Sequence, residues 1–183
     1  IYENTDVLKK ALNGVLTAGE LDIRIVYEKR LRDALIDDLI GTAVFASEAE
    51  VRKATRWLIR RTAAAAGVYV ASIQGLYEAM GRGEVSGFTV PAINIRALTY
   101  ETAQAVFRAA LAAGVGAVIF EIARSEIDYT RQRPEEYTCA VAAAALKTGY
   151  RGPLFLQGDH FQVGAKKYAA DPEAEVRAVK DLI

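Results

Sequence analysis

From Gly87 onward the sequence alternates between short apolar runs and amphipathic segments, and this alternation constrains the fold more than any other feature. The apolar runs are strand-like, whereas the segments between them have helical periodicity. Strands joined by helices predict right-handed βαβ crossovers and hence a parallel sheet. We expect three such units: 88–95 with a helix at 99–113, 117–123 with a helix at 134–149, and 154–156 with a helix that starts at Asp171-Pro172.

The number of units bears on the architecture. A free sheet of three parallel strands would leave two apolar edges open, which natural proteins avoid. A (β/α)8 barrel takes about 250 residues, and only residues 87–183 are available here. We therefore expect an α/β fold that contains the first three β/α units of a (β/α)8 TIM barrel. Because the chain starts without Met and stops at Ile183 inside an uncapped amphipathic segment, we expect a piece of a longer protein.

The first part of the chain has a different pattern. Residues 1–86 predict helices only, because their apolar residues follow the 3.6-residue period and strand-like alternation is not evident. The sequence therefore divides into a helical N-terminal extension, 1–86, and a barrel-like segment, 87–183. The expected helices run from Thr5 to Gly14, from Asp22 to about Phe45, from a capping box at Ser47 and Glu50 to Gly67, and from Ser72 to Met80.

Polar residues follow each predicted strand at its C-terminal end, which is the edge where parallel α/β proteins hold their ligands. The third apolar run, opened by Pro153, stops at an Asp-His pair that contains the only histidine of the chain. A carboxylate can move protons, and an imidazole can do the same or bind a metal. The alternative is that the acid caps a turn and orients a surface histidine. The groups at the three strand ends are Asn94 and Arg96, then Glu121, Arg124, Ser125 and Glu126, then Gln157, Asp159 and His160.

Glu121 stands out because it lies inside an apolar strand. A buried carboxylate costs several kcal/mol unless it is paired, so this residue needs a partner, a proton or a ligand. An ion pair with Arg96 or Arg124 and a direct contact with substrate are both open. The same two arginines could instead hold an anionic substrate.

Composition excludes several classes of function. Lys plus Arg and Asp plus Glu number 23 each, so no overall field attracts nucleic acid or a membrane surface. Cys139, the only cysteine, lies in a helical stretch and is expected to be a buried thiol. Apolar runs of the ~20 residues that span a bilayer are missing, as is a basic-then-apolar leader. We expect a cytoplasmic protein with neither nucleic-acid nor membrane partners.

Residues 87–183 resemble the class II, metal-dependent fructose-bisphosphate aldolases and their ketose-bisphosphate aldolase relatives. The specific part of the resemblance is the Asp159-His160 pair at the end of the third strand. The N-terminal helices look like an extension carried by a divergent subgroup of these aldolases. Supporting motifs are Val90-Pro-Ala-Ile-Asn94, Ala117-Val-Ile-Phe120 and Ala165-Lys-Lys167.

The resemblance implies a function in glycolysis and carbohydrate metabolism. The reaction would be the zinc-dependent, reversible aldol cleavage of a phosphorylated ketose, such as fructose 1,6-bisphosphate, through an enediolate. His160 matches the first Zn²⁺-ligating histidine, and Asp159 matches the acid that exchanges a proton with the aldehyde-derived oxygen. Asn94 matches a substrate-contacting asparagine, and Glu121 lies at a substrate-binding position. The ligands would be a phosphorylated ketose or triose phosphate, and the full-length protein is expected to be a homo-oligomer.

Two departures from the family concern substrate identity and completeness. Common members have a glutamine and then a serine where this chain has Glu121 and Ala123, and many have a histidine where it has Gln157. The other metal ligands and the phosphate-binding glycine loops of the family come from later strands. A catalytic zinc takes three protein ligands, so this chain alone is expected to be inactive. The alternatives are a non-catalytic aldolase-like subunit that stabilises a partner enzyme and an unrelated, metal-independent α/β binding domain.

Overall fold

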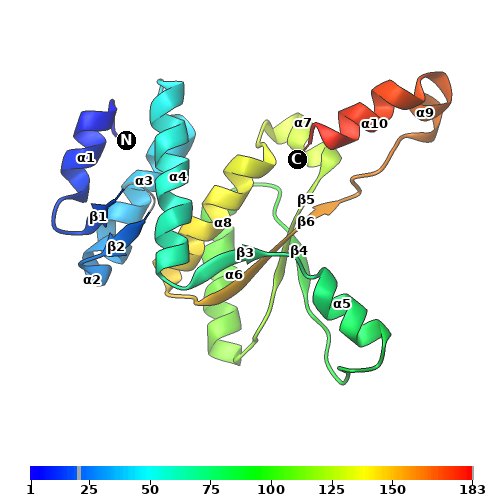
Figure 1. The fold of residues 1–183 in the computed structure, drawn as a ribbon, viewed down its shortest axis with the longest axis horizontal. Helices are drawn as coiled ribbons and strands as arrows, with labels where there is room; N and C mark the ends of the chain where they lie inside the picture. Colours follow the sequence, from blue (N-terminus) through cyan, green and yellow to red (C-terminus); the bar gives the residue numbers. More distant parts are fainter. Residues whose placement is uncertain (20–21, 183) are drawn as a thin grey trace.

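The computed structural model describes residues 1–19 and 22–182 and has a mixed α/β fold (Figure 1). Its main sheet has four parallel strands in the order β3-β6-β5-β4, and a separate antiparallel pair, β1-β2, lies near the N-terminus. The strands are β1 Leu16–Ala18, β2 Ile23–Ile25, β3 Val68–Ala71, β4 Ala92–Asn94, β5 Ile119–Ala123 and β6 Gly152–Asp159. The helices are α1 Thr5–Leu12, α2 Glu28–Arg30, the π-helix η1 Leu31–Leu35, α3 Ile36–Phe45, α4 Ala49–Ala65, α5 Gln74–Gly81, α6 Thr99–Ala113, α7 Arg124–Thr130, α8 Pro134–Thr148, α9 Ala165–Ala170 and α10 Pro172–Lys180.

The parallel sheet expected after Gly87 is confirmed, and β4, β5 and β6 are neighbours in chain order. Helix α6 has the predicted bounds, and α8 begins at Pro134 as expected for proline in the first helical turn. Gly149 ends α8 with a φ of 77°, a left-handed conformation that glycine adopts without strain.

Alternate residues of the strands face a helical layer on one side of the sheet. Val68, Phe120 and Leu154 are buried in a hydrophobic core that also contains residues of α6 and α8. The ring centroid of Phe107 in α6 lies 4.9 Å from that of Phe120. On the other side Tyr69 is 55% exposed, and Figure 1 shows α5 across the strands from α4, α6 and α8. The helices that build the core therefore cover one face of the sheet.

The prediction that residues 1–86 contain helices only is wrong, because this segment also contributes β1, β2 and β3. Strand β3 follows the turn at Gly67, which ends α4, and pairs in parallel with β6 from Val68↔Gly152 to Ala71↔Phe155. An apolar strand edge is costly to leave open, and β3 closes the edge of β6 that β5 leaves free. The sheet accordingly has four parallel strands rather than the expected three.

Smaller corrections concern local signals. The helix expected from Asp22 begins only at Glu28, because Ile23–Ile25 pairs with β1. Within the described residues the capping box at Ser47 does not form; the side chain of Arg52 instead donates to the carbonyls of Ala46 and Ser47. Strand β4 is shorter than expected, and helices α7 and α9 were not predicted from the sequence.

The two predicted segments share one hydrophobic core, and α8 is its centre. Helices α3, α4 and α6 all contact α8. Arg56 of α4 forms an ion pair with Glu136 of α8 at 2.7 Å, and Asp37 of α3 pairs with Lys147 of α8 at 2.6 Å. Across 1–19 and 22–182, helices with the length and apolar character needed to cross a membrane are not found.

A chain that starts at residue 87 should fail to form a cooperative fold. It would lose β3, the partner of β6, and the helices α3 and α4 that cover α8, and exposure of such apolar area removes the main stabilising contribution. Near-ultraviolet circular dichroism and urea unfolding of residues 87–183, compared with the 183-residue chain, would test this. A sigmoidal transition with the midpoint of the longer chain would contradict it.

Candidate functional site

The C-terminal ends of β4, β5 and β6 bring the predicted site residues together. Parallel register places Asn94 opposite Glu121 and Glu121 opposite Gln157, so the three side chains form one row across the sheet. Asp159 lies two residues further along β6, opposite Ala123, on the same face. This face is the one turned away from the core formed by α6 and α8.

One hydrogen bond connects the row to Asp159, and a second lies within the row. Asn94 Nδ2 donates to Asp159 Oδ2 at 3.0 Å, and Gln157 Nε2 donates to Glu121 Oε1 at 2.8 Å. Each carboxyl therefore has an amide partner that fixes the orientation of one of its oxygens. The structure thus confirms the predicted placement of Asn94, Glu121 and Asp159, while their chemical roles stay predictions.

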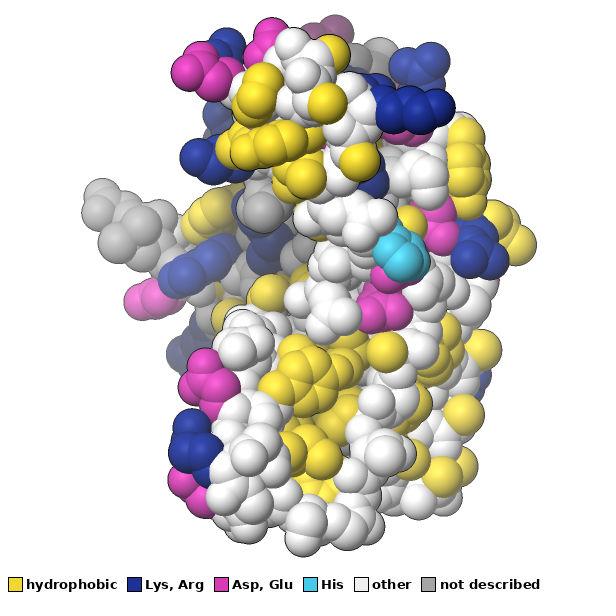
Figure 2. All heavy atoms as spheres, turned by 90° about the vertical axis from the view of Figure 1, so that its right-hand side faces the viewer, with side chains coloured by type: hydrophobic (Ala, Val, Ile, Leu, Met, Phe, Trp, Pro, Cys, Tyr) yellow, Lys and Arg dark blue, Asp and Glu magenta, His cyan; other side chains and the backbone are white. Residues whose placement is uncertain are grey.

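His160 lies at the rim of this edge and faces solvent. Its φ is 52°, in the left-handed region, and its carbonyl accepts a hydrogen bond from Gln162 N at 2.8 Å in a tight turn. The imidazole Nε2 lies 3.5 Å from Asp159 Oδ1, and the side chain is 73% exposed. Figure 2 shows the histidine (cyan) at the surface beside acidic side chains (magenta). The imidazole is thus accessible to a ligand that approaches from solvent.

Glu126 has a structural role that the sequence did not assign. Its side chain is 3% exposed and accepts hydrogen bonds from the backbone N–H of Ala123 at 2.8 Å and from Arg96 Nε at 2.6 Å. Burial alone raises the pKa of this carboxyl, but the hydrogen bonds from Ala123, Arg96 and Asn94 outweigh burial and hold its pKa below the ordinary value. The sequence signal for this role was the position of Glu126, three residues after the end of β5. An acid at the third position of a helix can accept a hydrogen bond from the backbone N–H of the residue that precedes the helix.

The sequence left two interpretations of Glu121 open, an ion pair with an arginine and a contact with substrate. Arg96 is bound to Glu126, and Arg124 is bound to Glu175, so in the described part of the chain neither arginine pairs with Glu121. Burial and then the negative charge of Asp159 raise the pKa of Glu121, and the hydrogen bond from Gln157 only partly offsets this. Contact with substrate is the interpretation that stays open.

The groups that could ligate a metal are few. Among residues 1–19 and 22–182, His, Cys, Asp and Glu side chains do not form a group of three or more that could hold an ion. Cys139 is fully buried in α8, and burial raises the pKa of its thiol to about 12, which makes it inert. His160 is the one imidazole that this chain can offer to a metal.

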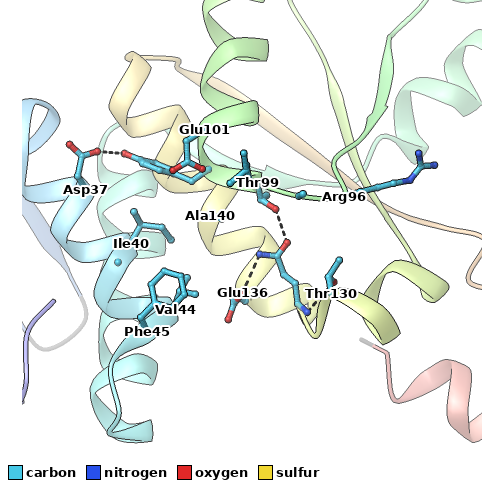
Figure 3. A pocket seen from close by; sticks show the side chains of 15 residues that line it. Asp37, Ile40, Val44, Phe45, Arg96, Thr99, Glu101, Thr130, Glu136 and Ala140 are labelled. Atoms are coloured by element: carbon cyan, nitrogen blue, oxygen red, sulfur yellow. Dashed lines mark hydrogen bonds between the residues drawn. The ribbon is translucent and has the colours of Figure 1, made fainter.

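Two hollows lie near the strand ends. A groove of about 730 Å³ between α3 and the start of α6 reaches Arg96 at its edge (Figure 3). Several of its polar side chains are joined by hydrogen bonds: Tyr100 Oη donates to Asp37 at 2.6 Å, and Thr99 Oγ1 donates to Gln132 at 2.7 Å. A second hollow, of about 540 Å³, adjoins the imidazole of His160. The second hollow is therefore the one that a ligand of His160 would enter.

No family model, curated protein or solved structure matches this chain. The aldolase resemblance of residues 87–183 therefore stays a prediction from the sequence.

Replacing Gly158 by Ala should disturb the turn that carries His160. A Cβ at this position would lie 2.6 Å from the ring of Phe161, so the ring must move. We expect a loss of about 1–3 kcal/mol of stability, measured by urea unfolding. Gly116→Ala is the matched control because its Cβ would meet nothing within 4 Å. Equal free energies of unfolding for Gly158→Ala and Gly116→Ala would contradict the expected clash between a Cβ at position 158 and the ring of Phe161.

Replacing Glu121 by Gln should raise stability at neutral pH. A carboxyl whose folded pKa is raised binds more protons folded than unfolded, so wild-type stability falls as pH rises from the ordinary glutamate pKa through the raised one. The variant lacks this penalty, and its advantage should vanish below about pH 4. Urea unfolding across this window tests it, with Glu101→Gln on α6 as a control for the loss of one negative charge. A variant less stable than wild type at neutral pH would contradict the burial argument.

Proposed function

We propose that this chain is the N-terminal part of a class II aldolase-like (β/α)8 barrel whose reaction is the reversible aldol cleavage of a phosphorylated ketose. The observation that carries the proposal is the meeting of Asn94, Glu121 and Asp159, from three consecutive parallel strands, at one sheet edge beside His160. Active sites of barrel enzymes lie at this edge.

Two helices lie as a barrel requires. In a barrel the helices lie outside the ring of strands. Here α6 and α8, which follow β4 and β5, pack on the same face. A closed barrel would pair β6 with a fourth barrel strand at the edge that β3 occupies. The proposal therefore requires β3 to leave this edge in the complete protein.

Under this proposal each residue has a separate task. Asp159 exchanges a proton with the aldehyde-derived oxygen of the substrate, a task that suits a half-exposed carboxylate held by Asn94. Asn94 orients this acid and contacts the substrate. Glu121 and Gln157 lie next to them on the same face of the sheet. A carboxylate at the position of Glu121 favours substrate hydroxyls over phosphate oxygens, because like charges repel.

Zinc is the cofactor that the proposal implies. A bound divalent metal polarises a ketone carbonyl. His160 would supply one ligand, but the residues of 1–19 and 22–182 do not complete a three-ligand site. The remaining ligands would come from later strands of the complete protein.

Two substitutions in the complete protein separate the roles of the Asp-His pair. Asp159→Ala should lower turnover by about 10²–10⁴-fold, the contribution of a positioned acid–base group, and keep the metal. His160→Ala should lose the metal, because one of three ligands is removed. Metal analysis and ketose-bisphosphate cleavage would be measured on both.

Asp128→Ala, which removes a neighbouring acid of α7 at the second hollow, is the control. Loss of zinc in Asp159→Ala together with full activity in His160→Ala would reverse the assignment. A complete protein that binds zinc weakly and cleaves no ketose bisphosphate would favour the non-catalytic aldolase-like subunit.

A further inference from the structure

Glu175 is a buried carboxyl that the strand-end site does not use. Its side chain is 5% exposed, and it is the residue that α10 buries. Helices α9 and α10 form an arm that extends beyond the C-terminal end of β6 (Figure 1), and α9 buries none of its described residues. Leu182, just after α10, is buried in the hydrophobic core and attaches the end of the arm, whereas within α10 the buried side chain is this acid.

The partners of Glu175 are an arginine and a backbone amide. Arg124 Nη1 and Nη2 lie 2.7 and 3.5 Å from the two carboxylate oxygens, and Gly164 N donates to Glu175 Oε1 at 2.8 Å. Arg124 Nη1 also donates to the carbonyl of Gln162 at 3.0 Å. The Arg124–Glu175 clamp, as we name this pair, therefore holds the backbone on both sides of Val163.

The clamped backbone continues directly from the site. Gln162 N donates to the carbonyl of His160, which closes the turn that follows β6. Arg124 follows Ala123, the register partner of Asp159. The clamp thus connects the end of β5, the turn at His160 and helix α10. The hydrogen bonds from Arg124 and Gly164 lower the pKa of Glu175, so the carboxylate keeps its charge.

We propose that Arg124 and Glu175 are positioning residues that fix the orientation of His160 at the strand edge. The clamp holds Gln162 and Gly164, and these two residues limit where the preceding turn can place the imidazole. Charge-assisted hydrogen bonds suit this task because they are short and directional. The use of His160 as a metal ligand rests on the proposed function, but its position can be measured with no ligand present.

The test uses two properties of the 183-residue chain. Its single histidine gives one unobscured imidazole signal in NMR spectra, and Lys166 and Lys167 in α9 are trypsin sites just beyond the clamp. The variants are Glu175→Ala and the conservative Glu175→Gln. Glu173→Ala, at an exposed position of the same helix, is the control.

In Glu175→Ala we expect cleavage after Lys166 or Lys167 to be faster by about tenfold or more, because proteolysis follows the population of locally open states and a charge-assisted hydrogen bond suppresses them. The imidazole signal should shift or broaden. Glu175→Gln, which keeps one acceptor oxygen, should lie between wild type and Glu175→Ala, and Glu173→Ala should match wild type.

Unchanged cleavage and an unchanged imidazole signal in both Glu175 variants would overturn the proposal. Faster cleavage with an unchanged imidazole signal would also overturn it, because the clamp would then hold the arm but not His160. If Glu175→Ala does not fold, as judged by circular dichroism, Glu175→Gln decides by the same two measurements. Neither readout depends on aldolase activity, so failure of the proposed function would leave this test intact.

Discussion

The burial of α8 is the constraint on which the rest of the structure depends. Tyr137 and residues 139–146 are buried, and most of this stretch is alanine. Small side chains let neighbouring helices approach closely, so α3, α4 and α6 can all lie against one helix. The same helix supports the site, because Tyr137 Oη donates to the backbone carbonyl of Glu121 at 2.7 Å. The end of β5 is thereby fixed from the core side while its polar side chains face the other way.

The sequence predicted those parts of the fold whose signals are local. The α6 bounds followed from periodicity and Gly114, and the α8 start followed from Pro134. The row of Asn94, Glu121 and Gln157 followed from a simple rule, since residues near the ends of neighbouring parallel strands share an edge. For these elements the local preference and the tertiary contacts agree.

The parts that were missed depend on contacts between distant residues. Strand β3 is a four-residue segment whose pairing with β6 spans more than 80 positions of sequence, and its own pattern is too short to distinguish a strand from a loop. Likewise, periodicity placed Arg96 and Arg124 near Glu121 but could not show that Glu126 and Glu175 compete for them. Ion-pair choice is decided by three-dimensional geometry, which a single sequence does not encode locally.

This choice of partners determines the charge at the strand edge. Arg96 compensates Glu126, and Arg124 compensates Glu175, whereas Glu121 and Asp159 have amides as hydrogen-bond partners. Amides orient carboxylates but do not neutralise them, so the edge keeps negative charge beside an exposed imidazole. A cation bound there would relieve the repulsion between the two acids. The electrostatics of the described residues therefore favour a positively charged ligand next to His160, which is the property that the proposed metal-dependent function requires.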